Sequence, residues 1–483
     1  RQRLGIAGLN EIYGKKVPGA LWATRFFREG QAEEFTVVLR PDGALYSVHH
    51  GLPETAAGAA LSKEEAIARA SAYLANEKKM DLKNWKLVAS GSEKHPNRVD
   101  HDLVWENSAP LGPAPSAAGS ANPLEAFQRV QLSVRGDEVT NFQTFIKIPD
   151  EWRRQQERES LWRTLLSVFK ACVTLAVGIA ALVFFLREIR SDLMKQVPWR
   201  QFSRWSLLAL AAFAVVTLAG SSIPGILGSN YNTSVPLKFM YVGLLIGFAL
   251  TGLFLIGLIV ALLGMGWFFL KQAYGEVELP AWVGMPREYY RDALLIAAGG
   301  TAAFVAIQRV KEWISPYWPT PQRGFAPAFG SDLDAYFPGL AVSARAVLLG
   351  LLETAVIAAL AGFILAHCKP RWLRALLFLA ASLAMVGDWG SPADFAKQWL
   401  VRLVFLAVVV FGVSVVARLN LLGYFLVLAV PSLLGGAESL LREPNGFYRR
   451  QGYIALLSLA VLLVWPLAAW LGGGRARQAE NEQ

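Results

Sequence analysis

The chain has 483 residues, of which 54% are hydrophobic, 12% aromatic and only 17% charged. This composition excludes an ordinary soluble domain and predicts a polytopic α-helical membrane protein. The net charge of +10 lies largely in short loops, where basic residues set membrane topology, so we expect the lipid bilayer and not nucleic acid as a partner. The two cysteines, Cys172 and Cys368, provide neither a disulfide framework nor a zinc site.

Residues 1–150 are polar and predict a separate α+β domain. Alternating side chains at Phe35–Leu39 and Ala44–Val48, with the turn residues Pro41–Gly43 between them, predict a β-hairpin. A helix should follow, because a serine and a glutamate three residues apart, Ser62 and Glu65, form a capping-box pattern. Further strands are expected at Lys86–Ala89, Leu103–Glu106, Phe127–Val134 and Thr140–Ile148.

Four of the five histidines lie in this domain, as the pair His49 and His50 and the cluster of His95 and His101. Neither pair has the helical His-x3-His spacing or the companion cysteines that zinc sites use. The Pro-Asn sequence after His95 indicates a turn. We therefore expect no metal ion and no cofactor.

Nine apolar runs follow in residues 151–473, and lipid requires that each be helical. Ala375–Val386 is the shortest of them. Close helix packing is expected along Gly243, Gly247, Gly252 and Gly257, which form a stripe of small residues. The nine runs are Leu161–Leu186, Trp205–Ile226, Phe239–Leu270, Ala293–Ile307, Ala346–Ala366, Ala375–Val386, Leu403–Val416, Leu421–Ala437 and Ile454–Leu471.

The loop between the first two runs holds five basic residues, whereas the loop over 228–237 holds none. Basic loops stay in the cytoplasm, so residues 1–150 are expected outside it and the tail 474–483 inside, in a bacterial-type inner (plasma) membrane. An exported domain needs a signal segment. Because the chain opens at Arg1 without an apolar leader, we expect a preceding segment to be missing.

Two resemblances add to this interpretation. The first domain, with its helix followed by strands and a final strand after Gly136–Val139, resembles the PepSY class of exported modules, which implies recognition rather than catalysis. From Trp152 onward, and most clearly over Ala346–Leu441, the helix order resembles the CAAX-protease and bacteriocin-processing (CPBP) family of intramembrane proteases. That resemblance implies a glutamate-activated water held by histidines, which would hydrolyse a peptide bond inside the membrane.

The residues that carry CPBP chemistry are mostly absent. The family uses Glu-Glu-x3-Arg on one helix, Phe-x3-His on the next and His-x3-Asn or His-x3-Asp on a later one. The corresponding segments here, Leu351–Leu360, Phe378–Asp388 and Val430–Gly436, hold one glutamate, Glu353, and no histidine. Such groups act as a unit, so losing several removes the activity.

Two literal motif matches lie in the wrong context. Glu64-Glu65-x3-Arg69 falls on the amphipathic helix of the first domain, where charges form a solvated face. Phe363-x3-His367 shares a helix with Glu353, and fourteen residues of helix separate that glutamate from His367 by about 21 Å. Neither match supplies the missing site.

Glu353 is therefore the single candidate catalytic residue. An ionisable side chain at membrane depth indicates function by default. The alternative is a protonated glutamate bonded to Thr354 or to a neighbouring helix, and the sequence leaves both open.

Three functions follow from the sequence. The first is a catalytically inactive CPBP relative that acts as a binding or scaffold protein, or as a subunit of a larger complex with a protein partner. The second is an active intramembrane endopeptidase that uses Glu353. The third is a transporter or lipid-handling membrane protein, although no internal repeat is evident.

Overall fold

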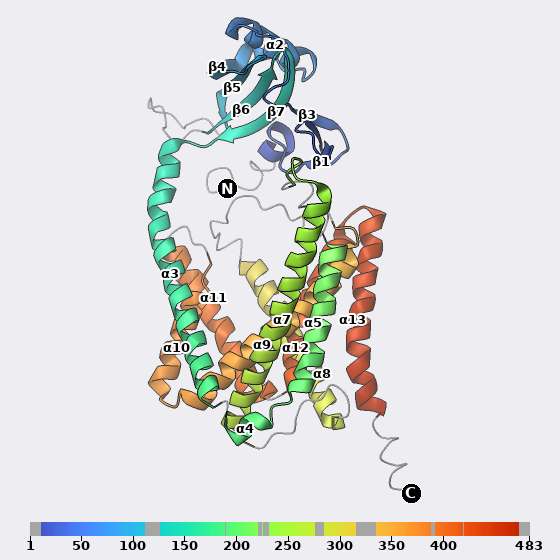
Figure 1. Ribbon diagram of the computed structural model, residues 1–483. Coiled ribbons are helices and arrows are strands. Elements are labelled where there is room, and N and C mark those ends of the chain that lie inside the picture. Colours follow the sequence, from blue (N-terminus) through green and yellow to red (C-terminus); the bar gives the residue numbers. More distant parts are fainter. Residues whose placement is uncertain are drawn as a thin grey trace. The chain divides into compact units, whose positions relative to one another are not determined.

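The computed structural model in Figure 1 describes residues 11–111, 126–188, 190–220, 225, 231–275, 285–314, 335–387, 392–418 and 420–472. The tail predicted at 474–483 lies outside these residues. The chain divides into two compact units. The first includes the N-terminal residues up to 163 and the segment 231–244, and the second includes the remaining helices.

The first unit holds two antiparallel sheets. The predicted hairpin is confirmed as β2 (Glu34–Leu39) and β3 (Leu45–Gly51), and β1 (Trp22–Phe27), which the sequence analysis missed, pairs with β2. The second sheet has the order β4-β5-β6-β7, and all four of its strands were predicted, although they are longer than expected. These strands are β4 (Trp85–Lys94), β5 (Val99–Leu111), β6 (Ala126–Arg135) and β7 (Glu138–Lys147).

One helix, α2 (Lys63–Asn76), covers the second sheet. Its predicted capping box is present, because the Glu65 amide donates to the Ser62 hydroxyl at 3.3 Å and the Glu65 carboxylate accepts from the Ser62 amide at 2.7 Å. Its apolar face, which includes the fully buried Leu74, packs on fully buried residues of β5 and β6 such as Leu103 and Leu132. Two short helices, η1 (Ile12–Lys16) and η2 (Leu82–Asn84), complete this unit.

The helices after β7 are long and apolar. Within the described residues, eight of them have the length and composition to cross a membrane, in α3, α5, α7, α8, α9, α11, α12 and α13. The helices in chain order are α3 (Asp150–Arg187), α4 (Asp192–Lys195), α5 (Trp199–Ala219), α7 (Leu237–Tyr274), α8 (Arg287–Ile314), α9 (Pro338–His367), α10 (Arg371–Ala384), α11 (Pro392–Phe411) with its continuation η3 (Gly412–Ala417), α12 (Leu421–Arg442) and α13 (Gly446–Gly472).

The ninth predicted span, Ala375–Val386, falls largely in α10. This helix has 14 residues and is therefore about 21 Å long, which is too short to cross a hydrocarbon core of about 30 Å by itself.

Contacts at the helix ends show the direction of the chain within the second unit. Phe184 and Phe185, near the end of α3, contact the rings of His367 and Phe268, which lie near the ends of α9 and α7. The hydroxyl of Tyr274 at the end of α7 donates to a carbonyl in η3 at 3.2 Å. Helices α3, α7, α9 and η3 therefore end at the same end of this unit.

At the opposite end of the unit, the end of α5 lies beside the starts of α9 and α13. The Phe337 amide, just before α9, donates to the Ala219 carbonyl at 3.0 Å. The Gly339 amide, in the first turn of α9, donates to the side-chain carbonyl of Gln451 at 3.1 Å. Because η3 ends where α9 ends, α11 and its continuation η3 run in the same direction as α9.

Helices α9 and α12 form the centre of the second unit. Helix α12 packs against α8, α9 and α13 and has the largest buried share among the candidate spans. At Gly350 of α9, a Cβ atom would lie 3.1 Å from the Cβ of Ala429 and 3.2 Å from the ring of Phe425, both on α12. Small residues thus bring these two helices into close contact.

The predicted glycine stripe of α7 is confirmed at Gly252, where a Cβ would lie 2.7 Å from a methyl carbon of Leu210 on α5, and is wrong at its other three positions. No described atom would lie within 4 Å of a Cβ at Gly243, Gly247 or Gly257. The close crossing of α7 lies further along, at Gly266, where a Cβ would be 2.7 Å from the Cβ of Ala358 on α9. The spacing of glycines alone therefore does not predict which face of a helix packs against another helix.

Candidate functional site

Glu353 lies in the middle of α9, with an exposed side chain, although its neighbours Thr354 and Ala355 are fully buried. None of the described residues forms a hydrogen bond or ion pair with its carboxylate. The Thr354 hydroxyl donates to the Gly350 carbonyl at 2.6 Å, as is usual for a threonine inside a helix. Thr354 is therefore not the partner of Glu353 that the sequence analysis considered.

His367 is an aromatic packing residue at the end of α9. Its ring centroid lies 4.6 Å from that of Phe184, 5.2 Å from Phe363 and 5.3 Å from Phe269. It stands fourteen residues from Glu353 on one helix, which separates the two by about 21 Å. His367 is therefore too far from Glu353 to hold the same water molecule.

Ordinary packing fills the two segments that were compared with the histidine motifs in the sequence, in α10 and α12. In α10, the Ser382 hydroxyl is fully buried and accepts a hydrogen bond from the Trp399 indole at 2.8 Å. In α12, Leu433 is buried, and a Cβ at Gly436 would lie 2.2 Å from a methyl group of Val342 on α9. Asp388, in the α10 segment, lies outside the described residues.

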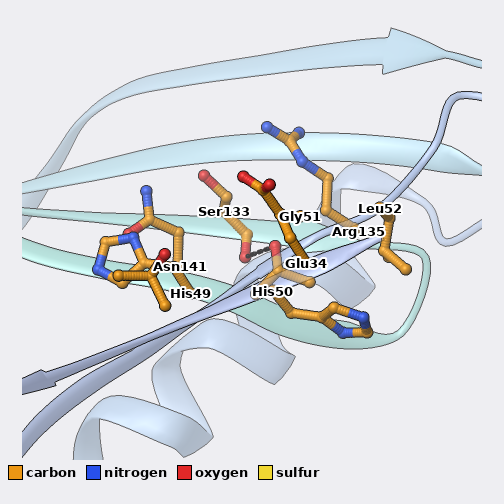
Figure 2. Close-up of a pocket in the computed structure, with 10 residues that line it drawn as sticks. Glu34, His49, His50, Gly51, Leu52, Ser133, Arg135 and Asn141 are labelled. Atoms are coloured by element: carbon orange, nitrogen blue, oxygen red, sulfur yellow. Dashed lines mark hydrogen bonds between the residues drawn. The ribbon is translucent and has the colours of Figure 1, made fainter. Parts of the chain in front are cut away.

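A second candidate site is a polar cleft of about 430 Å³ in the first unit, shown in Figure 2. It lies where the first sheet meets the β6–β7 edge of the second. Glu34 and Thr36 of β2 and His49 of β3 form one wall, and Arg135 and Asn141 form the other. The remaining lining residues are His50, Gly51, Leu52, Ser133 and Thr140.

Charged partners fix two of the cleft residues. Glu34 forms an ion pair with Arg25 of the neighbouring strand β1. Arg135 lies 3.3 Å from the carboxylate of Asp102 and 3.7 Å from that of Asp100. Because these charges are already paired, the cleft has polar walls without a strong excess of either charge.

His50 joins the two sheets at the rim of the cleft. Its Nδ1 lies 3.0 Å from the Glu138 carboxylate of β7, and its Nε2 lies 2.8 Å from the Glu33 carboxylate beside β2. Burial acts to lower the pKa of His50, but the hydrogen bonds and charges of Glu138 and Glu33 outweigh it and raise the pKa above its ordinary value. The ring also stacks on Phe35 with centroids 4.1 Å apart.

His49 and Asn141 supply the hydrogen-bonding groups of the cleft. Burial lowers the pKa of His49, so its ring is neutral at pH 7, and its Nε2 lies 3.0 Å from the Ser47 hydroxyl. Ser47 is itself buried and cannot reach a substrate as a nucleophile. The side-chain carbonyl of Asn141 is buried and accepts no hydrogen bond from the described residues. This arrangement suits binding of a hydrogen-bond donor more than catalysis.

The other two histidines of the first unit have structural partners. His95 lies in the predicted turn, after β4, and its Nε2 is 3.1 Å from the buried Asp100. His101 lies in β5 and is held by the Ser92 hydroxyl at 2.9 Å and the Leu61 carbonyl at 3.0 Å. Among the described residues, no group of three or more histidine, cysteine or acidic side chains is arranged to hold a metal ion.

Comparison with known proteins adds no further assignment. No family model, no curated protein and no solved structure matches the chain.

Proposed function

We propose that this chain is an integral membrane binding protein in which a helical unit of CPBP-like design has lost its proteolytic site and serves as a scaffold. The observation that carries the proposal is the close packing between α9 and α12, which leaves Glu353 without a catalytic partner. Their facing surfaces are filled by close packing of small and apolar residues, and the one acidic candidate, Glu353, stands alone among the described side chains. Hydrolysis needs a base together with its orienting partners.

The first unit is proposed as the exported recognition part. Its polar cleft offers neutral hydrogen-bonding groups at His49 and Asn141, which fits a protein or peptide segment as ligand. The helix directions support this arrangement. Helix α3 follows the first unit and ends at the same end of the helical unit as α7 and α9, whereas α13 begins at the other end and runs back. The first unit and the C-terminus would then lie on opposite sides of an inner membrane.

The test combines capture and cleavage in one sample. A photo-crosslinking amino acid at Thr36, in the cleft, is compared with the same group at the exposed Ala68 of α2, with the full chain in native membranes. We expect one partner captured at Thr36 and not at Ala68. The partner should remain uncut, equally for wild type and Glu353→Gln.

Two results would contradict the proposal. Cleavage of the captured partner by wild type but not by Glu353→Gln would make Glu353 the base of an active endopeptidase. An identical capture pattern at Thr36 and Ala68 would remove the cleft as the recognition site.

A further inference from the structure

One face of the first sheet is apolar and exposed. The pairings of Trp22 with Leu39 and of Phe26 with Phe35 bring these side chains onto the same face of β1 and β2. We call this surface the Trp22 face. Its large exposed side chains are Trp22 (46%), Phe26 (55%), Phe35 (39%), Leu45 (60%) and Val48 (39%).

The opposite face of the same sheet is already used. Val38 and Tyr46 point into the core of the first unit and are 7% and 6% exposed. The Tyr46 hydroxyl lies 2.7 Å from the Thr144 hydroxyl of β7. This side of the sheet packs on the core, whereas five large apolar side chains on the other side form a surface of the kind that marks an interaction site.

The first sheet is attached to the segment that enters α7. Arg25 of β1 donates to the Tyr231 carbonyl at 2.8 Å, and the Gly30 amide, in the turn between β1 and β2, donates to the Thr233 carbonyl at 2.9 Å. The rings of Phe27 and Tyr231 lie 5.0 Å apart. Two hydrogen bonds and a ring contact thus fasten the β1–β2 hairpin to residues 231–233.

This attachment lies close to the start of a candidate membrane span. Helix α7 begins at Leu237, six residues after Tyr231, and six residues reach at most about 20 Å. The Tyr231 hydroxyl donates to the Val235 carbonyl at 2.7 Å. This hydrogen bond folds the segment back on itself, so the distance from Tyr231 to the start of α7 is shorter than the fully extended length. In the first turns of α7, Phe239 and Val242 are 61% and 52% exposed, so apolar surface continues from the hairpin side into the span.

We propose that the Trp22 face docks on the interfacial layer of the lipid bilayer beside the start of α7. Aromatic side chains favour this layer, and the strand positions of the face carry no acidic residue. The two carboxylates at its edge, Glu33 and Glu138, are both paired with His50. The exposed Arg28 and Arg40, which follow β1 and β2, supply cations for lipid phosphates at its rim. The proposal rests on the membrane embedding proposed above. It gives the recognition unit a fixed orientation over the membrane.

The test uses depth-dependent quenching in the full chain. Cys172 and Cys368 are replaced by serine, and a polarity-sensitive fluorophore is attached to a single cysteine in place of Phe26 or Leu45. The protein is reconstituted in vesicles of a neutral and an anionic phospholipid. We expect blue-shifted emission at both sites and stronger quenching by lipids brominated near the glycerol end of the chain than by lipids brominated near the methyl end.

Two further labels separate failure of this proposal from failure of membrane embedding. A label at Phe254, exposed in the middle of α7, should be quenched by deeply brominated lipids, and a label at Ala68 on α2 should respond only to aqueous iodide. Quenching at 254 with iodide access at 26 and 45 overturns the docking but keeps the embedding. Absence of lipid quenching at 254 overturns both.

Other occupants of the face would be recognised in the same experiment. Protection from iodide without lipid quenching indicates that protein covers the face, and self-quenching that grows with the protein-to-lipid ratio identifies a second copy. Either result overturns the proposal. As a matched functional check, Phe26→Asp should give loss of lipid quenching at position 45, whereas Ala68→Asp should leave it unchanged.

Discussion

At the scale of single residues, two adjacent histidines on one strand respond to their surroundings in opposite ways. His50 stands between two carboxylates, Glu33 and Glu138, and its pKa is raised, whereas burial lowers the pKa of His49. The sequence shows that the two histidines are adjacent, but it does not show that their pKa values shift in opposite directions. Glu33 and Glu138 come from segments 105 positions apart, and only the meeting of the two sheets brings them to one ring.

The first prediction concerns the pH dependence of the first unit. Because the folded pKa of His50 is raised, its two ion pairs stabilise the fold below about pH 6.5, and this contribution is lost as pH rises through the raised value. His50→Gln should therefore flatten the loss of stability that occurs as the pH rises above about 6.5. Amide hydrogen exchange in β3 and β7, followed against pH in the full chain, measures this.

His49→Gln is the matched control, since a lowered folded pKa works with the opposite sign. The contribution of neutral His49 is present above about pH 6.5 and is lost as pH falls below it. This variant should reduce the acid sensitivity of the same amides. Equal pH profiles for wild type and His50→Gln would mean that the two ion pairs do not form in solution.

At the scale of elements, the sequence was most informative where a local pattern decides the structure. The capping box at Ser62 and the Pro41–Gly43 turn need only neighbours in the chain, and both are present. β1 was missed because its alternating pattern is broken by the charged Arg25, which pairs across the sheet with Glu34. The contact face of α7 was misjudged because helix neighbours, not glycine spacing, decide where two backbones meet.

The second prediction tests the crossing of α7 with α9. Gly266→Ala should destabilise the helical unit by about 1–3 kcal/mol, because the added methyl group would lie 2.7 Å from the Cβ of Ala358 and 2.9 Å from its backbone carbon. Gly257→Ala, on the same helix with no described atom within 4 Å, should instead be neutral or stabilising by up to about 1 kcal/mol. Unfolding by sodium dodecyl sulfate in mixed micelles compares the two variants. Equal effects would show that the crossing lies elsewhere.

At the scale of the whole molecule, composition predicted long apolar helices and a small β-rich domain before them, and both are present. What it could not supply is the chemistry of the site. The resemblance to CPBP proteases rests on helix order, and no family model matches the chain. The sequence predicted Glu353 as a candidate catalytic residue but could not show which groups surround it. In the structure its side chain is exposed and has no hydrogen-bond or ion-pair partner among the described residues.

The third prediction concerns the passage of the chain across the membrane. If the chain crosses the bilayer once between α9 and α11, in addition to the eight candidate spans, the first unit and the C-terminus lie on opposite sides. A cysteine at Ala68 should then react with an impermeant maleimide added outside intact cells, while a fluorescent-protein reporter after Gln483 should be fluorescent inside. Both markers on one side would mean an even number of crossings.

The central position of α12 has a consequence for how the protein is made. Helices α8 and α9 are synthesised well before α12, yet α12 provides much of the surface on which they pack. The ribosome must add 75 residues between His367, the end of α9, and Arg442, the end of α12, which takes on the order of ten seconds. If the helical unit is embedded in a membrane as proposed, Gly350 and its neighbours on α9 face lipid or the insertion machinery during that interval, without their native partner. A nascent chain that stops before Leu421 would therefore be a substrate for membrane quality-control proteases.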